Sequence, residues 1–266
     1  MGLVAYRQKL LHGTPYIITE HWSRYLPGND FSGGLRKRLT RKVVRHAQCV
    51  TTVSEVLAQA MQSHGLNHPN YRLLPNVVDT ELFKPIPHRN DIPKIVHVSC
   101  FEDQSKNISG LLEALKTLKD GGFAFQAVLI GEGMDLEAMK QKALDLELTD
   151  CVRFTGLLQG QALVDEWATG DCFVLPSRYE TGGIVLLEAM ACGIPVVATR
   201  VGALPEIVNE SNGILVPSGD TKALAQAMEQ CCRNLGKYDS EKLRKQVVER
   251  YSYECVGRLI HQLYSS

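Results

Sequence analysis

From about residue 92 onward, short apolar runs alternate with amphipathic stretches, and this alternation limits the fold more than any other feature of the sequence. Near-continuous apolar strands separated by helices are typical of a parallel sheet that is covered by helices on both faces. The expected strands cover 94–100, 125–130, 151–155, 172–175 and 195–199, and the expected helices cover 108–118, 134–146, 160–169 and 183–192. The pattern therefore predicts an α/β domain built on a parallel sheet.

Charged residues and glycines follow several of these strands. Open α/β sheets bind their ligands beyond the carboxyl ends of the strands. The residues that follow a strand in this way are Lys106, Gly131, Gly133, Glu180, Gly182 and Gly183. Their common position predicts a ligand site at the carboxyl edge of the sheet.

The segment 177–198 is the most informative part of this edge, because it has the pattern of a strand end, a glycine turn, a buried helix and the next strand. A glycine pair that opens a helix offers free backbone N–H groups and the positive end of the helix dipole, which suit a phosphate. Glu188 follows at roughly 7 Å along the helix axis, which suits the ribose of the same nucleotide. Glu180 precedes the turn and faces the group that the pyrophosphate carries. The alternative is a buried helix whose glutamates form caps or ion pairs.

This segment resembles the Glu-x7-Glu signature of the retaining family 4 glycosyltransferases, which have the GT-B fold. The likeness continues through 189–193, 195–198 and Gly202 to 205–208. The resemblance implies two Rossmann-like domains that use a nucleotide-diphosphate sugar as substrate, with no cofactor. It also implies a glycan or lipid-linked acceptor and a place in polysaccharide biosynthesis. The mechanism that the resemblance implies needs no metal ion, and the sequence, which has no Asp-x-Asp pair near the segment, is consistent with this.

The resemblance also implies roles for particular residues. Glu180 would bind hydroxyls of the donor sugar, and Lys106 would take up charge on the departing phosphate, which helps to deprotonate the acceptor. His21 would hydrogen-bond the transferred sugar or the phosphate, unless it is a structural histidine. The catalytic residues expected are therefore Glu180, Lys106 and His21, and the expected donor-binding residues are Glu188, Gly182, Gly183, Ile184, Gly131, Gly133 and Leu157.

The sequence departs from the family pattern just before the lysine. Family members usually carry a Gly-Arg pair there, but this chain has Cys100-Phe101. Either Lys106 acts alone, Arg178 or Arg200 replaces the missing arginine, or the site is weakened.

Other candidates have plain structural alternatives. Gly131 and Gly133 serve either phosphate and base contacts or the close packing of a turn. Leu157 contacts the nucleobase or lies in an ordinary loop. Trp22 and Tyr25, close to His21, are candidates for stacking on a sugar face.

Residues 1–84 resemble the second half of the amino-terminal, acceptor-side domain of the family. The expected elements are strands at 15–20, 49–53 and 71–74 and helices at 33–46 and 54–64, the last capped by Ser54. The family has further strands before this point, so we interpret the chain as amino-terminally truncated. This interpretation predicts an exposed apolar face and aggregation through residues 1–84.

The prolines of 75–93 indicate a linker between two domains. We therefore predict a partial acceptor-side domain at 1–84 and a complete nucleotide-sugar-binding domain at 85–238. The remaining residues, 239–266, are expected to form two helices, and in GT-B proteins such a terminal segment packs back on the amino-terminal domain.

Composition narrows the partners and the location. Lys+Arg and Asp+Glu both number 29, so nothing argues for nucleic acid. The stretch 33–46 carries six Lys/Arg and has Leu35, Leu39 and Val43 at helical spacing, which indicates either a solvated basic face or a contact with a membrane surface. Eight cysteines without a Cys-x-x-Cys motif suggest reduced thiols. The expected location is cytoplasmic. If the basic face contacts a membrane, the protein is expected to attach peripherally to the inner face of that membrane.

Two other functions are alternatives to sugar transfer. A nicotinamide or flavin oxidoreductase would need Gly-x-Gly-x-x-Gly in its first strand–helix turn, and the motif is absent. A sugar-nucleotide-binding fragment without transferase activity remains the stronger alternative, because the acceptor-side domain is interpreted as incomplete.

Overall fold

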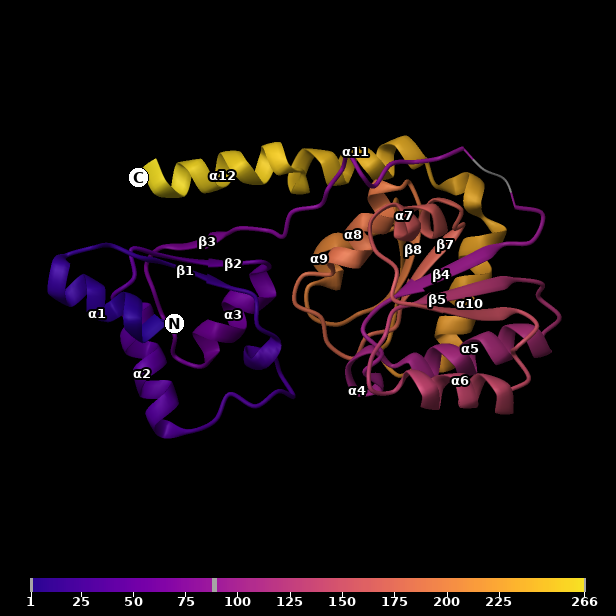
Figure 1. Cartoon of the computed structure of the whole chain (residues 1–266), viewed down its shortest axis with the longest axis horizontal. Coiled ribbons are helices and arrows are strands. Elements are labelled where there is room, and N and C mark those ends of the chain that lie inside the picture. The colour runs from indigo at the N-terminus through magenta and orange to yellow at the C-terminus, as the bar shows by residue number, and fades with distance from the viewer. Residues whose placement is uncertain (1, 88–89, 266) are drawn as a thin grey trace.

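The computed structural model describes residues 2–87 and 90–265 and contains two parallel sheets at opposite ends of the molecule (Figure 1). Helices pack on both sheets. The terminal helices α11 (Ser240–Tyr251) and α12 (Tyr253–Ser265) run from the larger sheet to the smaller one along the top of Figure 1. The expected α/β class is confirmed.

The larger sheet has its described strands all parallel, in the order β6-β5-β4-β7-β8-β9. Their bounds are β4 Lys94–Val98, β5 Gln126–Ile130, β6 Val152–Gly156, β7 Cys172–Leu175, β8 Val196–Thr199 and β9 Gly213–Val216. The direction of strand addition reverses between β4 and β7, and an open parallel sheet binds its ligand at the carboxyl ends beside such a switch point.

Helices cover both faces of this sheet, as the apolar strands predicted. On one face, α5 (Ile108–Asp120), α6 (Leu136–Asp145) and α10 (Thr221–Arg233) contribute to the core. On the other face, α7 (Gly160–Ala168), α8 (Ile184–Ala191) and α11 do so. The sequence patterns did not single out β9 or α10. β9 is a four-residue edge strand with a half-buried middle, so its apolar run is short.

The smaller sheet has the order β1-β2-β3, with β1 Ile17–Glu20, β2 Cys49–Thr52 and β3 Tyr71–Leu73. It packs with the short 3-10 helix η1 (Ser23–Tyr25) and with the α-helices α2 (Gly34–Arg45) and α3 (Glu55–Ser63). Ser54 caps α3 as expected, because its Oγ accepts a hydrogen bond from the Leu57 N–H at 3.3 Å. Helix α1 (Gly2–His12), which packs on α2, was not predicted, since it buries no residue.

One face of the smaller domain is open. Among the described residues β1 pairs only with β2, and a hollow of about 970 Å³ lies between β1, α1 and α2. Leu35 is 73% exposed, whereas Val43 and Val44 are buried. The expected helix over 33–46 is present as α2, and it buries its apolar row only toward the carboxyl-terminal end. The apolar exposure expected for residues 1–84 is present.

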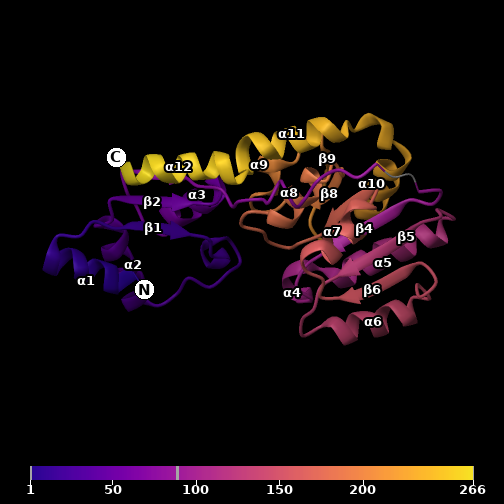
Figure 2. The same cartoon turned by 45° about the horizontal axis from the view of Figure 1, so that its top comes forward.

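Helix α12 lies beside the smaller sheet in both views (Figures 1 and 2), and a pocket of about 320 Å³ between them is lined by residues of both, including Ile17 and Ile260. The chain enters α12 through the extended Ser252. On α11, the Arg244 guanidinium donates to the carbonyls of Thr80 at 2.7 Å and Phe83 at 2.8 Å. These bonds fix the segment that joins the two sheets.

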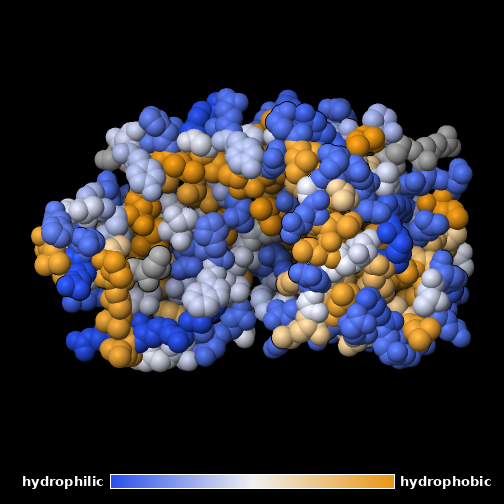
Figure 3. Space-filling model, in the orientation of Figure 1, coloured by the Kyte–Doolittle hydropathy of each residue, from blue (hydrophilic) through white to orange (hydrophobic). Residues whose placement is uncertain are grey.

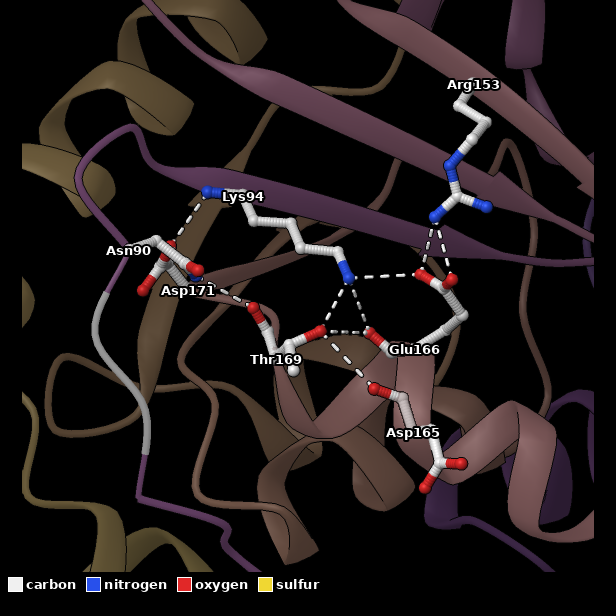
Figure 4. A network of polar contacts seen from close by, with 7 residues as sticks. All are labelled: Asn90, Lys94, Arg153, Asp165, Glu166, Thr169 and Asp171. Atoms are coloured by element: carbon white, nitrogen blue, oxygen red, sulfur yellow. Dashed lines mark hydrogen bonds and ion pairs between the residues drawn. The ribbon is translucent and has the colours of Figure 1, made fainter.

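A polar network fixes the amino end of β4 to α7 (Figure 4). The Lys94 ammonium lies 3.0 Å from a carboxylate oxygen of Glu166 and donates to the Thr169 hydroxyl at 2.6 Å. Arg153 donates to both oxygens of Glu166, at 2.7 and 2.8 Å. The backbone N–H of Lys94 donates to Asp171 at 2.7 Å. Every carboxylate and ammonium of this network therefore has a partner.

All eight cysteines are free thiols, and of the five buried ones Cys49 and Cys172 lie in strands. Within residues 2–87 and 90–265, no helix is both long and apolar enough to cross a bilayer.

Candidate active site

Two of the predicted catalytic residues meet at the switch point of the larger sheet. Lys106 ends the short helix α4 (Asp103–Lys106), which follows β4, and Glu180 lies in the loop that follows β7. The Lys106 ammonium lies 2.9 Å from a carboxylate oxygen of Glu180, and both side chains are largely shielded from solvent. The sequence predicted that both residues belong to this edge, but it did not predict that they pair.

The loops that carry this pair are held together by Arg178. Its backbone N–H donates to the Ser105 carbonyl at 2.8 Å, and its guanidinium donates to the Asn107 side chain at 2.6 Å and to the Asp103 carbonyl. The guanidinium is thus engaged in bracing α4, which argues against Arg178 as the replacement for the missing phosphate arginine. Arg200 is exposed, and its side chain makes no hydrogen bond or ion pair within the described residues.

Unpaired backbone donors lie next to Glu180, at the start of α8. Gly183 adopts the left-handed conformation, with φ of 56°, immediately before Ile184 begins the helix. In the described part of the chain, the N–H groups of Gly182, Gly183, Ile184 and Val185 have no hydrogen-bond acceptor. Such a row of donors at the positive end of a helix suits an anion. The glycine pair therefore has the geometry that the sequence predicted for a phosphate.

Glu188 lies in the second turn of α8, half-buried among apolar neighbours. Its carboxylate makes no hydrogen bond or ion pair within residues 2–87 and 90–265. Burial raises the pKa of Glu188 from 4.5 to about 7, because a desolvated carboxylate without a partner is costly to ionise. The alternative in which this glutamate forms a cap or an ion pair is therefore not what the structure contains.

Apolar donor-site candidates stay accessible at the same edge. Ile184 is 38% exposed at the first position of α8, and Leu157 is 51% exposed just after β6. Large exposed apolar side chains beside a polar site suit contact with a base or a sugar face. Their contact with the donor stays a prediction.

Gly131 and Gly133 have a packing role. A Cβ on Gly131, where φ is 137°, would lie 1.9 Å from the Ser99 carbonyl oxygen, and a Cβ on Gly133 would lie 2.5 Å from that of Phe101. The turn after β5 thus lies against the loop after β4 with no room for a side chain. This observation favours the packing alternative, and contact with phosphate or base stays a prediction.

His21 lies on the smaller domain, just after β1. Asn76 connects it to the glycine turn at the start of α8. Its Nδ1 lies 3.1 Å from the Asn76 side-chain oxygen, so Nδ1–H donates and Nε2 remains free to accept. The Asn76 amide nitrogen in turn leaves no space for a Cβ on Gly182, which would lie 2.8 Å away. Sequence analysis missed this role of Asn76, although the residue stands in the conspicuous Leu-Pro-Asn stretch that ends the first domain.

The two aromatic side chains near His21 that are candidates for stacking on a sugar differ in their exposure to solvent. Trp22 is 53% exposed, and the Arg24 guanidinium lies 3.5 Å from the centroid of its ring. Tyr25 is buried against Phe31, and its hydroxyl faces Glu20 at 3.3 Å. The proposed stacking of Tyr25 on a sugar is therefore wrong, because its ring is part of the core.

A buried histidine under the site also escaped notice. His97 on β4 is fully buried; its Nδ1–H donates to the Val174 carbonyl at 2.8 Å, and its Nε2 accepts from the Ser99 hydroxyl at 2.7 Å. Burial lowers the pKa of His97 to about 4, so the ring is neutral at neutral pH. Single histidines in strands carry no spacing signal, so only the structure could reveal this contact between β4 and β7.

Within the described residues, no three His, Cys, Asp or Glu side chains gather in a way that could hold a metal ion. The site is thus defined by one ion pair, a row of backbone donors and one unpaired carboxylate.

Comparison with known families identifies the class. The family described as glycosyl transferases group 1 matches residues 92–234, more than half of the chain, and the glycosyl transferase 4-like domain matches residues 1–77. The chain therefore belongs to the group 1 glycosyl transferases, and the resemblance to family 4 glycosyltransferases is confirmed.

Individual relatives give the same placement. The chain is 30% identical to N-acetyl-alpha-D-glucosaminyl L-malate synthase of Bacillus anthracis over 96% of its length, which covers 66% of that protein. It is 29% identical to the sulfoquinovosyl transferase SQD2 of Arabidopsis thaliana, over 90% of this chain and 46% of that protein. The fold matches Anabaena HepE, solved with UDP and glucose, with a TM-score of 0.86 and 21% identity over all of this chain and 75% of HepE. The chain thus spans roughly half to two thirds of the length of these two relatives.

Proposed function

We propose that this protein takes part in retaining transfer of a sugar from a nucleotide-diphosphate donor to a glycan or lipid-linked acceptor. The observation that carries the proposal is the Lys106–Glu180 pair beside the free N–H groups that open α8. This arrangement offers a cation and backbone donors to a diphosphate, and a carboxylate to the sugar that the diphosphate carries.

In the proposed donor complex, the diphosphate lies on the N–H groups of 182–185 and the Lys106 ammonium. Glu188 accepts hydrogen bonds from the ribose hydroxyls. Because the pKa of Glu188 is about 7 in the free protein and these bonds need the charged form, nucleotide affinity should rise as the pH rises through 7.

In the proposed reaction, the bond from the anomeric carbon to the phosphate oxygen breaks, and the acceptor oxygen bonds to the same face of that carbon. The departing phosphate takes the acceptor proton, so no enzyme nucleophile is required. Lys106 and the start of α8 neutralise the charge on the phosphate. Glu180 steadies positive charge on the sugar, and His21 Nε2 accepts a bond from a sugar hydroxyl. Groups of the protein thus neutralise both the negative charge on the phosphate and the positive charge on the sugar. This supports a mechanism without a metal ion.

We further propose a cytoplasmic protein that contacts an anionic membrane through the 33–46 region, where a lipid-linked acceptor would be met. Arg36, Arg38 and Arg45 are exposed and have no described partner, and exposed apolar side chains of α1 and α2 lie close to them. Figure 3 shows hydrophobic and hydrophilic residues side by side over this part of the molecule. A basic surface with apolar side chains suits a headgroup layer.

Isosteric variants of the two glutamates test the division of roles. UDP is the probe, since HepE was solved with it. Glu188→Gln should weaken UDP binding by about tenfold in calorimetry, because a charge-assisted hydrogen bond is lost. Glu180→Gln should keep or improve UDP affinity, since Lys106 loses its partner, while release of UDP from a panel of UDP-sugars falls by about 100-fold. Equal loss of UDP affinity in both variants would contradict these roles.

Vesicle sedimentation tests the membrane contact. Replacing Arg36, Arg38 and Arg45 by Gln should weaken binding to phosphatidylglycerol-containing vesicles by about 100-fold, at about 1 kcal/mol per charge. The control replaces Lys222, Lys242 and Lys245, which are exposed on α10 and α11. Equal binding by the two variants would rule the surface out.

A binding protein without transferase activity is the second candidate. The open hollow beside β1 favours it, because an acceptor-side domain with an uncovered apolar face is poorly suited to hold an acceptor. UDP binding by the intact wild-type chain without any UDP release from UDP-sugars would support this candidate.

A further inference from the structure

A carboxylate of the larger domain holds the start of a helix in the smaller one. Glu206, on the single turn α9 (Leu204–Ile207), accepts hydrogen bonds from the backbone N–H of Val56 at 2.7 Å and of Glu55 at 3.1 Å. These are the first two residues of α3, and Ser54 takes the next free donor, on Leu57. A negative charge at this end of a helix is favoured by the helix dipole.

The same turn is bound to the loop that carries Glu180. The N–H of Ala203 donates to the Glu180 carbonyl at 3.1 Å. At Gly202, where φ is 49°, a Cβ would lie 1.8 Å from that carbonyl oxygen. The donor-side loop and α9 therefore lie in direct backbone contact, with no space between them for a side chain.

Among the described residues, the two bonds to Glu206 are the only hydrogen bonds that join residues 2–74 to residues 92–238. Around them lies a pocket of about 340 Å³ lined from both sides, for example by Val53 and Ile207. Glu206 therefore carries the hydrogen-bonded link between these two parts of the molecule.

We propose that Glu206 is a positioning residue that holds the acceptor-side domain in register with the donor-side loop at Glu180. This role rests on the proposed function only in its consequence for transfer. The link runs from α3 through the Glu206 carboxylate and α9 to the Glu180 carbonyl. Loss of the carboxylate frees the start of α3 and loosens the Ala203–Glu180 bond, while every group proposed to touch the nucleotide stays in place.

Amide hydrogen exchange, followed by NMR in the full chain, tests the link without any substrate. In Glu206→Ala, exchange at Glu55 and Val56 should rise by about tenfold, and exchange at Ala203 should rise with it. Glu206→Gln keeps an oxygen acceptor without the charge and should be intermediate. Glu210→Ala removes an exposed carboxylate with no described partner and should change none of the three. Unchanged exchange at Glu55 and Val56 in Glu206→Ala would overturn the proposal, and a rise there without one at Ala203 would overturn its reach to the donor loop.

The consequence for transfer is measured separately. Glu206→Ala should bind UDP within twofold of wild type, while kcat/KM for transfer falls by about tenfold. A fall in UDP affinity as large as the fall in kcat/KM would overturn the positioning role. If the wild-type chain binds no UDP at all, the proposed function fails, and the exchange experiment still decides the role of Glu206.

Discussion

Glu166 on α7 and Glu188 on α8 are both half-buried carboxylates on the same face of the larger sheet. Glu166 lies near the amino ends of the strands and Glu188 near the carboxyl ends. Their pKa values are shifted in opposite directions. Burial alone would raise the pKa of Glu166, but the bonds from Arg153 and Lys94 outweigh burial and hold it below its usual value. Glu188 has burial without a partner, and its pKa rises to about 7.

The difference separates a structural charge from one that is kept for a ligand. A half-buried carboxylate that only stabilises the fold gains from partners within the protein, as Glu166 does with two cations. An unpaired carboxylate lowers the stability of the free protein, so its presence in an apolar helix needs another explanation. The edge with the unpaired carboxylate is also the edge with free backbone donors.

The largest effect should come from breaking the satisfied network. Glu166→Ala leaves the nearly buried Lys94 ammonium without its carboxylate, which should lower the free energy of unfolding by about 3 kcal/mol. Urea denaturation measures this. Glu113→Ala, which breaks the exposed pair with Lys142, is the control and should cost below about 1 kcal/mol. Calorimetry should show unchanged UDP affinity in both variants, and a large change for Glu166→Ala would mean that the two edges are coupled.

The next effect concerns stability at the unpaired carboxylate. The folded pKa of Glu188 lies above its unfolded value of 4.5, so wild type loses stability as the pH rises from about 4.5 to about 7. Glu188→Gln removes this cost and should be more stable than wild type by about 2–3 kcal/mol at pH 8, with no gain at pH 4. Urea denaturation at both pH values checks the sign. A gain that does not depend on pH would show that it does not come from the raised pKa of Glu188, and a loss at pH 8 would show that Glu188 is paired in the folded state.

Lys106 tests the comparison from the side of the cation, because it lies at the carboxyl edge of the sheet, where the ligand is proposed to bind. Lys106→Met should weaken UDP binding by roughly thirtyfold, the loss of a charge-assisted contact of about 2 kcal/mol, and uridine binding by less than about twofold. Calorimetry with both ligands separates the phosphate contact from a structural role. Lys116→Met on α5 removes a half-buried ammonium that pairs with Asp120, away from the ligand site, and is the control. Equal losses for UDP and uridine would make Lys106 structural.

The smallest effect lies at the rim of the satisfied network. Thr169→Val removes the hydroxyl that accepts from the Lys94 ammonium and should lower the free energy of unfolding by about 1 kcal/mol. Lys94 keeps its bond to Glu166, so the loss stays small. In urea denaturation, a loss as large as that of Glu166→Ala would mean that the hydroxyl, and not the ion pair, holds the network together.

Much of the larger domain followed from the sequence because its signals are local. The strands at 94–98, 126–130, 152–156, 172–175 and 196–199 have apolar runs that show parallel pairing, and Gly182-Gly183 marks the start of α8. The smaller domain was harder. Helix α1 buries nothing and so leaves no apolar periodicity, and Leu35 is exposed although Val43 of the same apolar row is buried.

The sequence by itself determined the class of the protein, its parallel α/β fold and the edge at which Lys106, Glu180 and Glu188 gather, because strand polarity and motif spacing are carried by neighbours in the chain. Only the tertiary structure decided which groups are paired. Lys106 meets Glu180 across 74 residues, Glu206 meets α3 across 150, and Glu188 meets no partner in the described residues. Hydrogen bonds and burial depend on distances between segments remote in sequence, and these are fixed only when the sheets and helices pack.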